Sequence, residues 1–278
     1  MKNLGYYNGK VGLIENVQIP ITDRAFYFGD GVYDAVMCRN DIPYLLSQHT
    51  QRLYYNCERL EITPPISREE LEMLICELVR AVDGIEKFVY FHISRGSGLR
   101  EHSAMPDKGN LCIMITPQGI GNIGVKMNAI IAPDVRYELC DMKTLNLLPS
   151  VLASQKARKN GVDEAIFHRN GVVTECTHSN VSIIKNGEII TAPADKHILP
   201  GVTRAHLINE AKMLGITVRE EKYTTNDLLH ADEILITSSS KLLRGVERVD
   251  GVNVGGKNQA LLEALQKALM GNYLKETS

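Results

Sequence analysis

A single lysine in the segment LCDMKTLNLLPS, residues 139–150, is the first residue whose surroundings suggest chemistry. Lys143 stands directly before an apolar run. Lysine is rarely fully buried because its ammonium loses hydration, so its stem usually lies along the surface with the head in water. Two interpretations are open: a solvated lysine at a strand end, or a partly desolvated lysine whose neutral amine could form a Schiff base with a carbonyl.

Three other segments carry polar groups that could bind an ion. Glu175 ends a hairpin strand of mostly apolar residues, where a glutamate is either exposed at an edge or, if buried, requires a cationic partner or a proton. A helix that begins after a Pro-Gly pair would direct the N–H groups of Val202 and Thr203 at an anion. A serine run at 238–240 ends a predicted strand. Helix starts and solvated loops of this kind are common, so no segment identifies a site by itself.

The elements that must position these residues include helices in both halves of the chain. Ser67 and Glu70 form a capping box at the start of an amphipathic helix over 67–82. Further helices are predicted over residues 47–62, 149–161, 201–215 and 258–274. Asn-Gly pairs favour type I′ turns, which need a positive φ at both central positions, and they predict hairpins at residues 8–9, 170–171 and 186–187.

A glycine-rich loop over residues 95–110 joins two predicted strands. Loops of that length are uncommon unless they are functional or disordered. A second glycine-rich segment, PQGIGNIG, is poor in core-forming residues and predicts a linker. The chain is therefore expected to be α+β, with an N-terminal domain over 1–118, a linker over 119–123 and a C-terminal domain over 124–278 that carries Lys143.

Composition excludes several classes of function. The chain has 278 residues, of which 44% are hydrophobic, and a net charge of −2 that gives no reason to expect nucleic acid or an anionic membrane as partner. No stretch approaches the roughly 20 apolar residues that span a bilayer. The first residues lack the apolar core of a signal peptide, so a cytoplasmic address is expected. Six scattered cysteines without a CxxC pair and eight dispersed histidines give no sign of a metal site.

Five segments, in chain order, resemble motifs of the fold-type IV pyridoxal-phosphate-dependent aminotransferases, and most closely those of the bacterial D-amino acid transaminases. They are DRAFYFGDGVYDAV, CDMKTLNLL, HRNGVVTECTHSNV, ILPGVTR and DEILITSSS. The matches run from about residue 22 to about residue 245 and cover most of the chain. The resemblance implies a two-domain α+β fold with the cofactor between the domains.

The resemblance also assigns roles around pyridoxal 5′-phosphate. Lys143 would form the Schiff base with the cofactor and then act as the general acid and base at the substrate Cα. Glu175 would lie against the pyridine nitrogen and keep the ring protonated. The residues that would hold the phosphate are Arg52, Val202, Thr203, Ser238 and Ser239. No metal is implied.

The substrate side of the resemblance depends on SRGSGLREHSAMP, residues 94–106. In D-amino acid transaminases an Arg-x-His pair here binds the substrate carboxylate with a tyrosine from the opening motif, and Arg100, His102 and Tyr33 match those positions. Ser240 is the further residue assigned to the substrate. Lyases of the family tend to carry Arg-Gly-Tyr here, and branched-chain enzymes lack the pair. The structural alternative for Arg100 and His102 is a solvated loop.

Some residues depart from the family pattern. Cys176 follows the glutamate where glycine is usual, Thr177-His178 replaces a hydroxyl-rich pair, and Pro149 follows the lysine segment where a small residue is more usual. None of them removes a catalytic group, so they bear on substrate preference and leave the chemistry in place.

The expected function is transfer of the amino group of a D-alanine-like amino acid to a 2-oxoglutarate-like acceptor. The alternatives are a branched-chain L-amino acid transaminase, an aminodeoxychorismate lyase, or a pyridoxal-phosphate carrier without turnover. A homodimer is also expected, in which the 95–110 loop completes the neighbouring active site. An interface that orders this glycine-rich loop would spare the entropy cost of ordering it at each binding event.

Overall fold

The computed structural model describes residues 1–278 and divides them into two compact units. Unit 1 consists of Met1–Gly119, Met142–Asn146 and Tyr273–Ser278, and unit 2 consists of Ile120–Asp141 and Leu147–Asn272. Each unit contains helices and a sheet, and the predicted two-domain α+β class is confirmed. The sequence places Lys143 in the second domain, whereas the contacts of its segment group it with unit 1. The domain boundaries drawn from the sequence stay a prediction.

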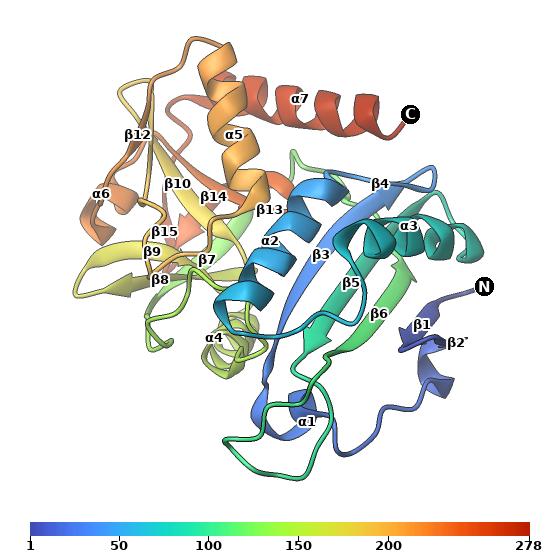
Figure 1. The fold of residues 1–278 in the computed structure, drawn as a ribbon. Helices are drawn as coiled ribbons and strands as arrows, with labels where there is room; N and C mark the ends of the chain where they lie inside the picture. The colour runs from blue at the N-terminus through green and yellow to red at the C-terminus, as the bar shows by residue number, and fades with distance from the viewer. The chain divides into compact units, whose positions relative to one another are not determined.

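Unit 1 is a six-stranded sheet with helices over one face (Figure 1). The strand order is β2-β1-β6-β5-β3-β4. The strands are β1 (Leu4–Tyr7), β2 (Lys10–Gly12), β3 (Gly31–Arg39), β4 (Ile42–Pro43), β5 (Glu86–Ser94) and β6 (Asn110–Pro117). The helices are α1 (Arg24–Phe28), α2 (Leu46–Arg59) and α3 (Arg68–Leu78).

The core of unit 1 lies between the sheet and the helices α2 and α3. Alternate residues of β3 and β5, such as Val36 and Phe91, are fully buried against Leu53 of α2 and Leu71 of α3. Such alternation is what a sheet with one covered face requires. The predicted capping box of α3 is confirmed, since the Ser67 side chain and the Glu70 side chain each accept the other's backbone N–H.

The segment that carries Lys143 pairs with the edge of β3. The Tyr33 N–H donates to the Lys143 carbonyl at 2.9 Å, and the Leu145 N–H donates to the Gly31 carbonyl at 3.0 Å. Val32 and Thr144 form an antiparallel bridge between these two bonds. The backbone of the segment thus fills hydrogen-bonding positions that β4, which pairs only with the far end of β3, leaves open.

Unit 2 contains a nine-stranded sheet of mixed direction in the order β12-β11-β10-β13-β14-β7-β8-β9, with β15 beside β14. Its strands are β7 (Met127–Pro133), β8 (Glu164–Arg169), β9 (Val172–Cys176), β10 (Asn180–Lys185), β11 (Glu188–Thr191), β12 (Val218–Glu220), β13 (Glu233–Ser238), β14 (Leu242–Val249) and β15 (Val252–Asn253). Its helices are α4 (Leu148–Lys159), α5 (Val202–Met213), α6 (Thr225–Leu229) and α7 (Gln259–Glu276), of which the last residues are grouped with unit 1.

Several apolar clusters hold unit 2 together. Leu207 of α5 and Leu265 of α7 pack against Leu235 of β13 in one of them, and α4 covers β7 and β8 through Ala157 in another. All three predicted Asn-Gly hairpin turns are confirmed: each asparagine has φ between 46° and 54° and each glycine has φ between 78° and 88°. These values place both residues in the left-handed region, which Asn and Gly tolerate best.

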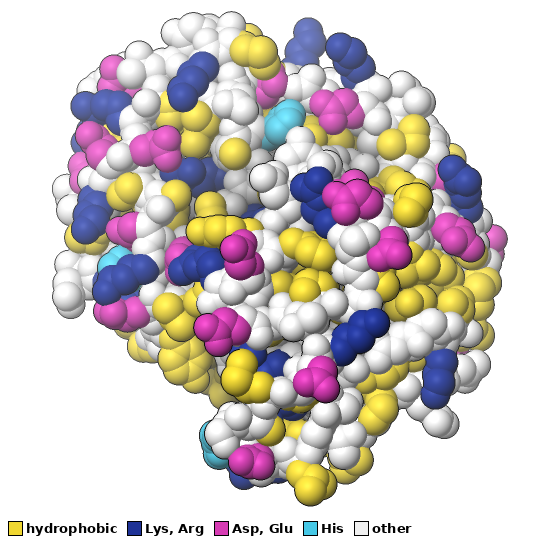
Figure 2. All heavy atoms as spheres, in the orientation of Figure 1, with side chains coloured by type: hydrophobic (Ala, Val, Ile, Leu, Met, Phe, Trp, Pro, Cys, Tyr) yellow, Lys and Arg dark blue, Asp and Glu magenta, His cyan; other side chains and the backbone are white.

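The surface of the chain shows no charge segregation on the side that Figure 2 draws, where basic and acidic side chains are interspersed. This distribution agrees with the small net charge of −2. No helix is both long enough and apolar enough to cross a membrane.

We expect Gly31→Ala to loosen the lysine segment. A Cβ at Gly31 would lie 2.7 Å from the Ile93 carbonyl oxygen and 2.8 Å from a Leu145 methyl group, so β3 or the segment must shift. The cost should be about 1–3 kcal/mol and should appear as a lower thermal unfolding midpoint. Gly271→Ala is the matched control: it adds a Cβ in open space within a helix and should be neutral or slightly stabilising. Equal midpoints for both variants would contradict the close packing at Gly31.

Candidate active site

Lys143 and Tyr33, which the sequence assigns to one site, are in direct contact in unit 1. The Lys143 Nζ lies 4.2 Å from the centroid of the Tyr33 ring. The ring of Tyr33 in turn stacks on Tyr90 at 5.6 Å. Lys143 is half-buried, and its amine lies over the face of an aromatic ring. A cation over an aromatic face is held in place without engaging its N–H groups in hydrogen bonds.

Arg52 of α2 forms a buried ionic cluster with Asp34 of β3. Its Nε and Nη2 donate to the two Asp34 carboxylate oxygens, each at 2.9 Å. The His49 Nδ1 lies 2.7 Å from Asp34 Oδ1, and the Asp34 side chain has no exposed surface. The sequence assigns Arg52 to a phosphate, and in the structure two of its guanidinium N–H groups are donated to Asp34.

The charges in this cluster follow from burial and pairing. Burial raises the pKa of Asp34, but the charge of Arg52 and the hydrogen bonds from Arg52 and His49 outweigh it, so the pKa lies below its ordinary value. Burial lowers the pKa of His49, and Asp34 offsets this only partly. We therefore describe the cluster at neutral pH as an ionised carboxylate between one guanidinium and one neutral imidazole.

Arg100 and His102 converge on one aromatic ring of the same unit. The Arg100 guanidinium carbon lies 5.2 Å from the Phe28 ring centroid, and the His102 ring centroid lies 4.7 Å from it. Both side chains are exposed. The sequence signalled this pair through its Arg-x-His spacing, and the structure adds that α1 supports it.

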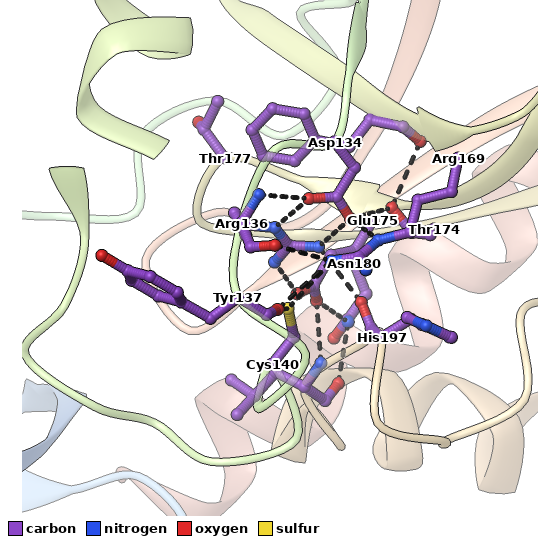
Figure 3. A network of polar contacts seen from close by, with 12 residues as sticks. Asp134, Arg136, Tyr137, Cys140, Arg169, Thr174, Glu175, Thr177, Asn180 and His197 are labelled. Atoms are coloured by element: carbon purple, nitrogen blue, oxygen red, sulfur yellow. Dashed lines mark hydrogen bonds and ion pairs between the residues drawn. The ribbon is translucent and has the colours of Figure 1, made fainter. Parts of the chain in front are cut away.

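Glu175 of β9 is buried in unit 2 within the polar network of Figure 3. One carboxylate oxygen contacts Arg136 Nη1, and the other accepts hydrogen bonds from Asn180 Nδ2 at 2.9 Å and from the Leu199 N–H at 3.1 Å. The exposed edge residue that the sequence left open is therefore excluded. A buried carboxylate with a guanidinium and two N–H donors is satisfied by its partners and held in one orientation.

The Arg136 side chain is itself fixed by a second carboxylate. Asp134 accepts hydrogen bonds from Arg136 Nε at 2.9 Å and Nη2 at 2.8 Å, and also from Arg169 and Thr174. Burial would lower the pKa of Arg136, but Asp134 and Glu175 raise it above its ordinary value. Figure 3 shows these side chains coming together from β8, β9 and the segment after β7.

The helix start of α5 and the serine run lie on packed elements of unit 2. α5 begins at Val202 without a side-chain cap, so its first N–H groups have no capping partner. At the end of β13, on which α5 packs, the Ser238 Oγ and the Thr237 Oγ1 are buried without a hydrogen-bond partner. Ser239 and Ser240 follow as half-buried residues. Uncapped N–H groups and unpaired buried hydroxyls are groups that a phosphate could satisfy.

Comparison with known proteins assigns the family. Residues 31–249 match the family described as amino-transferase class IV. The chain belongs to the class IV aminotransferases. It is 38% identical over 246 residues to a D-alanine aminotransferase of Listeria monocytogenes serotype 1/2a (strain 10403S), covering 86% of this chain and 85% of that protein. It is 34% identical over 278 residues to a D-alanine aminotransferase of Bacillus licheniformis, covering 98% of each.

A solved structure of a similar protein has the same fold. It is the crystal structure of a branched-chain aminotransferase from the thermophilic archaeon Thermoproteus uzoniensis with norvaline. It superposes with a TM-score of 0.87 at 22% identity and covers 98% of this chain and 96% of that one. With the family match, the resemblance drawn from the five sequence motifs is confirmed.

Two of the residues by which this class IV aminotransferase departs from the family pattern, Thr177 and His178, contact the buried Glu164. Cys176 is fully buried, and the Thr177 hydroxyl donates to a carboxylate oxygen of Glu164. The His178 Nδ1 lies 3.5 Å from Glu164, and Lys241 Nζ lies 3.7 Å from it. The position of the His178 ring is therefore fixed by its contacts with Thr177 and Glu164.

Sequence reasoning missed several polar residues of this aminotransferase. Asp34 and His49 stand on apolar faces of β3 and α2, and an aspartate inside an apolar strand was a usable signal. Asp134 and Arg136 follow β7 as an Asp-x-Arg pair. This pair did not indicate a buried ionic cluster in the sequence, because its partners come from other strands. No group of three or more His, Cys, Asp or Glu side chains is arranged to hold a metal.

We expect Asp34→Asn to destabilise the protein in a pH-dependent way. Removing one partner of a buried ion pair costs about 3–5 kcal/mol at neutral pH. The pKa of Asp34 is lower in the folded chain than in the unfolded chain, so its stabilisation is fully present above the unfolded pKa of about 4 and is lost as the pH falls. The difference in urea unfolding midpoint between wild type and variant should therefore shrink below about pH 4.

The control for this substitution is Asp107→Asn, which changes an exposed carboxylate. It should leave the midpoint within experimental error of wild type at neutral pH. A wild-type-to-Asp34→Asn difference that stays the same from pH 7 to pH 3 would show that Asp34 is not the ionised partner of Arg52.

Proposed function

We propose that the protein is a pyridoxal 5′-phosphate-dependent transaminase that moves the amino group of a D-amino acid such as D-alanine to a 2-oxo acid such as 2-oxoglutarate. The observation that carries the proposal is the 34% identity to a D-alanine aminotransferase over 98% of both chains. The Arg100, His102 and Tyr33 side chains support it, because they match the carboxylate-binding residues of D-amino acid transaminases. A cytoplasmic address remains part of the proposal.

The residues present fit the cofactor. Its phosphate would be bound by the uncapped N–H groups of Val202 and Thr203, by Ser238 and Ser239, and by Arg52. Support comes from the buried Ser238 Oγ, which has no hydrogen-bond partner, and from the uncapped start of α5. Glu175 would face the ring nitrogen, where an ionised carboxylate favours the protonated ring. When bound, the cofactor supplies an electron sink for the substrate Cα.

Lys143 is the residue that would carry the proton. Its Nζ would hold the cofactor between turnovers and, when free, would take up the proton from the substrate Cα and later release it. The Tyr33 ring, 4.2 Å from the Nζ, keeps the amine near one position. This placement supports proton transfer because a base must lie within hydrogen-bonding reach of the proton that it moves.

The chirality of the substrate would be set by where its carboxylate is held. A guanidinium matches the two oxygens of a carboxylate through parallel N–H donors, and Arg100 has no hydrogen bond within the chain that competes for them. Fixing the carboxylate on one side, with Ser240 contacting the substrate, decides which Cα hydrogen faces Lys143. The preference for the D-isomer is then an effect of positioning.

We expect Lys143→Ala to abolish D-alanine-dependent formation of glutamate from 2-oxoglutarate, because the variant lacks both the nucleophile and the base. Lys156→Ala, at an exposed position of α4, is the matched control and should keep wild-type activity. The measurement is a coupled assay with D-alanine or L-leucine as donor. Wild-type turnover of L-leucine without D-alanine would replace the proposal with a branched-chain transaminase. Full activity of Lys143→Ala would remove this lysine from the mechanism.

We further propose a homodimer in which the 95–110 loop of one chain serves the active site of its neighbour. Sedimentation should then give about twice the chain mass of 30.9 kDa at micromolar concentration. Mixing Arg100→Ala and Lys143→Ala chains should restore activity, because one site in each mixed dimer has both intact residues. Mixed dimers that form but stay inactive would show that the loop serves its own chain.

A further inference from the structure

Phe28, at the end of α1, contacts three side chains that bear on the carboxylate loop. Arg100 and His102 lie on its ring at the distances given above, and the Arg24 guanidinium carbon lies 4.8 Å from the same centroid. A cation over an aromatic face is held without its N–H groups, so those of Arg100 stay able to bind a carboxylate. One ring of α1 thus supports both proposed carboxylate ligands.

Arg24 fixes the backbone that bears these ligands. Its side chain is almost fully buried, which is rare for arginine and requires its charge and N–H groups to be satisfied. Its Nη1 donates to the Glu101 carbonyl at 2.7 Å, and its Nη2 donates to the His102 carbonyl at 3.4 Å. Glu101 lies between Arg100 and His102, so the anchored carbonyls belong to the Arg-x-His turn itself.

The base of the loop is held by the same elements. Asp30 accepts from Arg24 Nε at 2.8 Å and from Arg95 Nε at 2.9 Å, so one carboxylate offsets two buried or half-buried guanidinium charges. The Arg24 N–H also donates to the Gly96 carbonyl at 3.0 Å. Figure 1 shows the loop between β5 and β6 lying beside α1.

We infer that Arg24 and Phe28 are positioning residues that hold Arg100 and His102 in a preformed arrangement for the substrate carboxylate. The inference rests on the proposed function, in which Arg100 and His102 bind that carboxylate. A long exposed loop ordered only by its ligand would lose conformational entropy at each binding event. Contacts from α1 remove that loss before the substrate arrives and so strengthen binding.

The test compares Phe28→Leu with Phe28→Tyr and Phe26→Leu in the holoenzyme. Phe28→Leu removes the aromatic face, Phe28→Tyr keeps it, and Phe26→Leu makes the same change at an exposed residue of the same helix. Two quantities are measured: KM and kcat for D-alanine, and amide hydrogen exchange of residues 99–103 without substrate. Phe28→Leu should raise KM roughly five- to tenfold with little change in kcat and should speed exchange. Phe28→Tyr and Phe26→Leu should match wild type in both.

The outcomes separate this inference from the proposed function. A wild-type enzyme that does not use D-alanine contradicts the proposed function, and the exchange measurement still tests whether Phe28 orders the loop. Wild-type KM or wild-type exchange in Phe28→Leu overturns the inference while the proposed function stands. An equal KM increase in Phe26→Leu or Phe28→Tyr also overturns it. If Phe28→Leu does not fold, Phe28→Met, which also lacks the ring and is similar in volume to leucine, takes its place under the same criteria.

Discussion

The pairing of Met142–Leu145 with the edge of β3 is the interaction on which the placement of Lys143 depends. Two backbone hydrogen bonds and one bridge fix the segment beside Gly31–Tyr33. The approach is close enough that Gly31 has no room for a Cβ. A strand edge offers its N–H and C=O groups at fixed spacing. Pairing there therefore fixes which residue of the lysine segment lies opposite each residue of β3. The contact between Lys143 Nζ and the Tyr33 ring follows from that register.

In each unit, the buried carboxylates near the proposed cofactor residues are neutralised by guanidinium groups of the chain itself. Asp34 is matched by Arg52, and Glu175 is matched by Arg136, whose other side is bound by Asp134. An ionised group that is buried alone would be neutralised or would destabilise the fold, so each of these carboxylates needs its guanidinium. The consequence for function is orientation: Glu175 and Arg52, the two charged groups proposed to hold the cofactor, have little rotational freedom.

The carboxylate loop illustrates a different use of charge. Arg24 and Asp30 lie inward and bind the loop backbone and each other, whereas Arg100 and His102 are exposed on the Phe28 ring. The sequence suggested a mobile glycine-rich loop ordered by an interface. The structure shows that contacts within the chain already order its Arg-x-His turn. A dimer interface would then add a neighbour to a loop whose arrangement is largely set.

The sequence by itself determined the local elements and the family. Capping at Ser67, the Asn-Gly turns and the helical spacing in α2 and α5 depend on neighbours within a few residues, so their signals are complete in the chain. The ordered motifs around Lys143, Glu175 and Ser238 identified the class IV aminotransferases for the same reason. The partners of buried charges were decided only by the tertiary structure. Arg136 meets Glu175, and Arg24 meets the carbonyls of Glu101 and His102, across sequence separations of 39, 77 and 78 residues. No local pattern encodes such a contact, because it exists only once segments distant in sequence have folded next to one another.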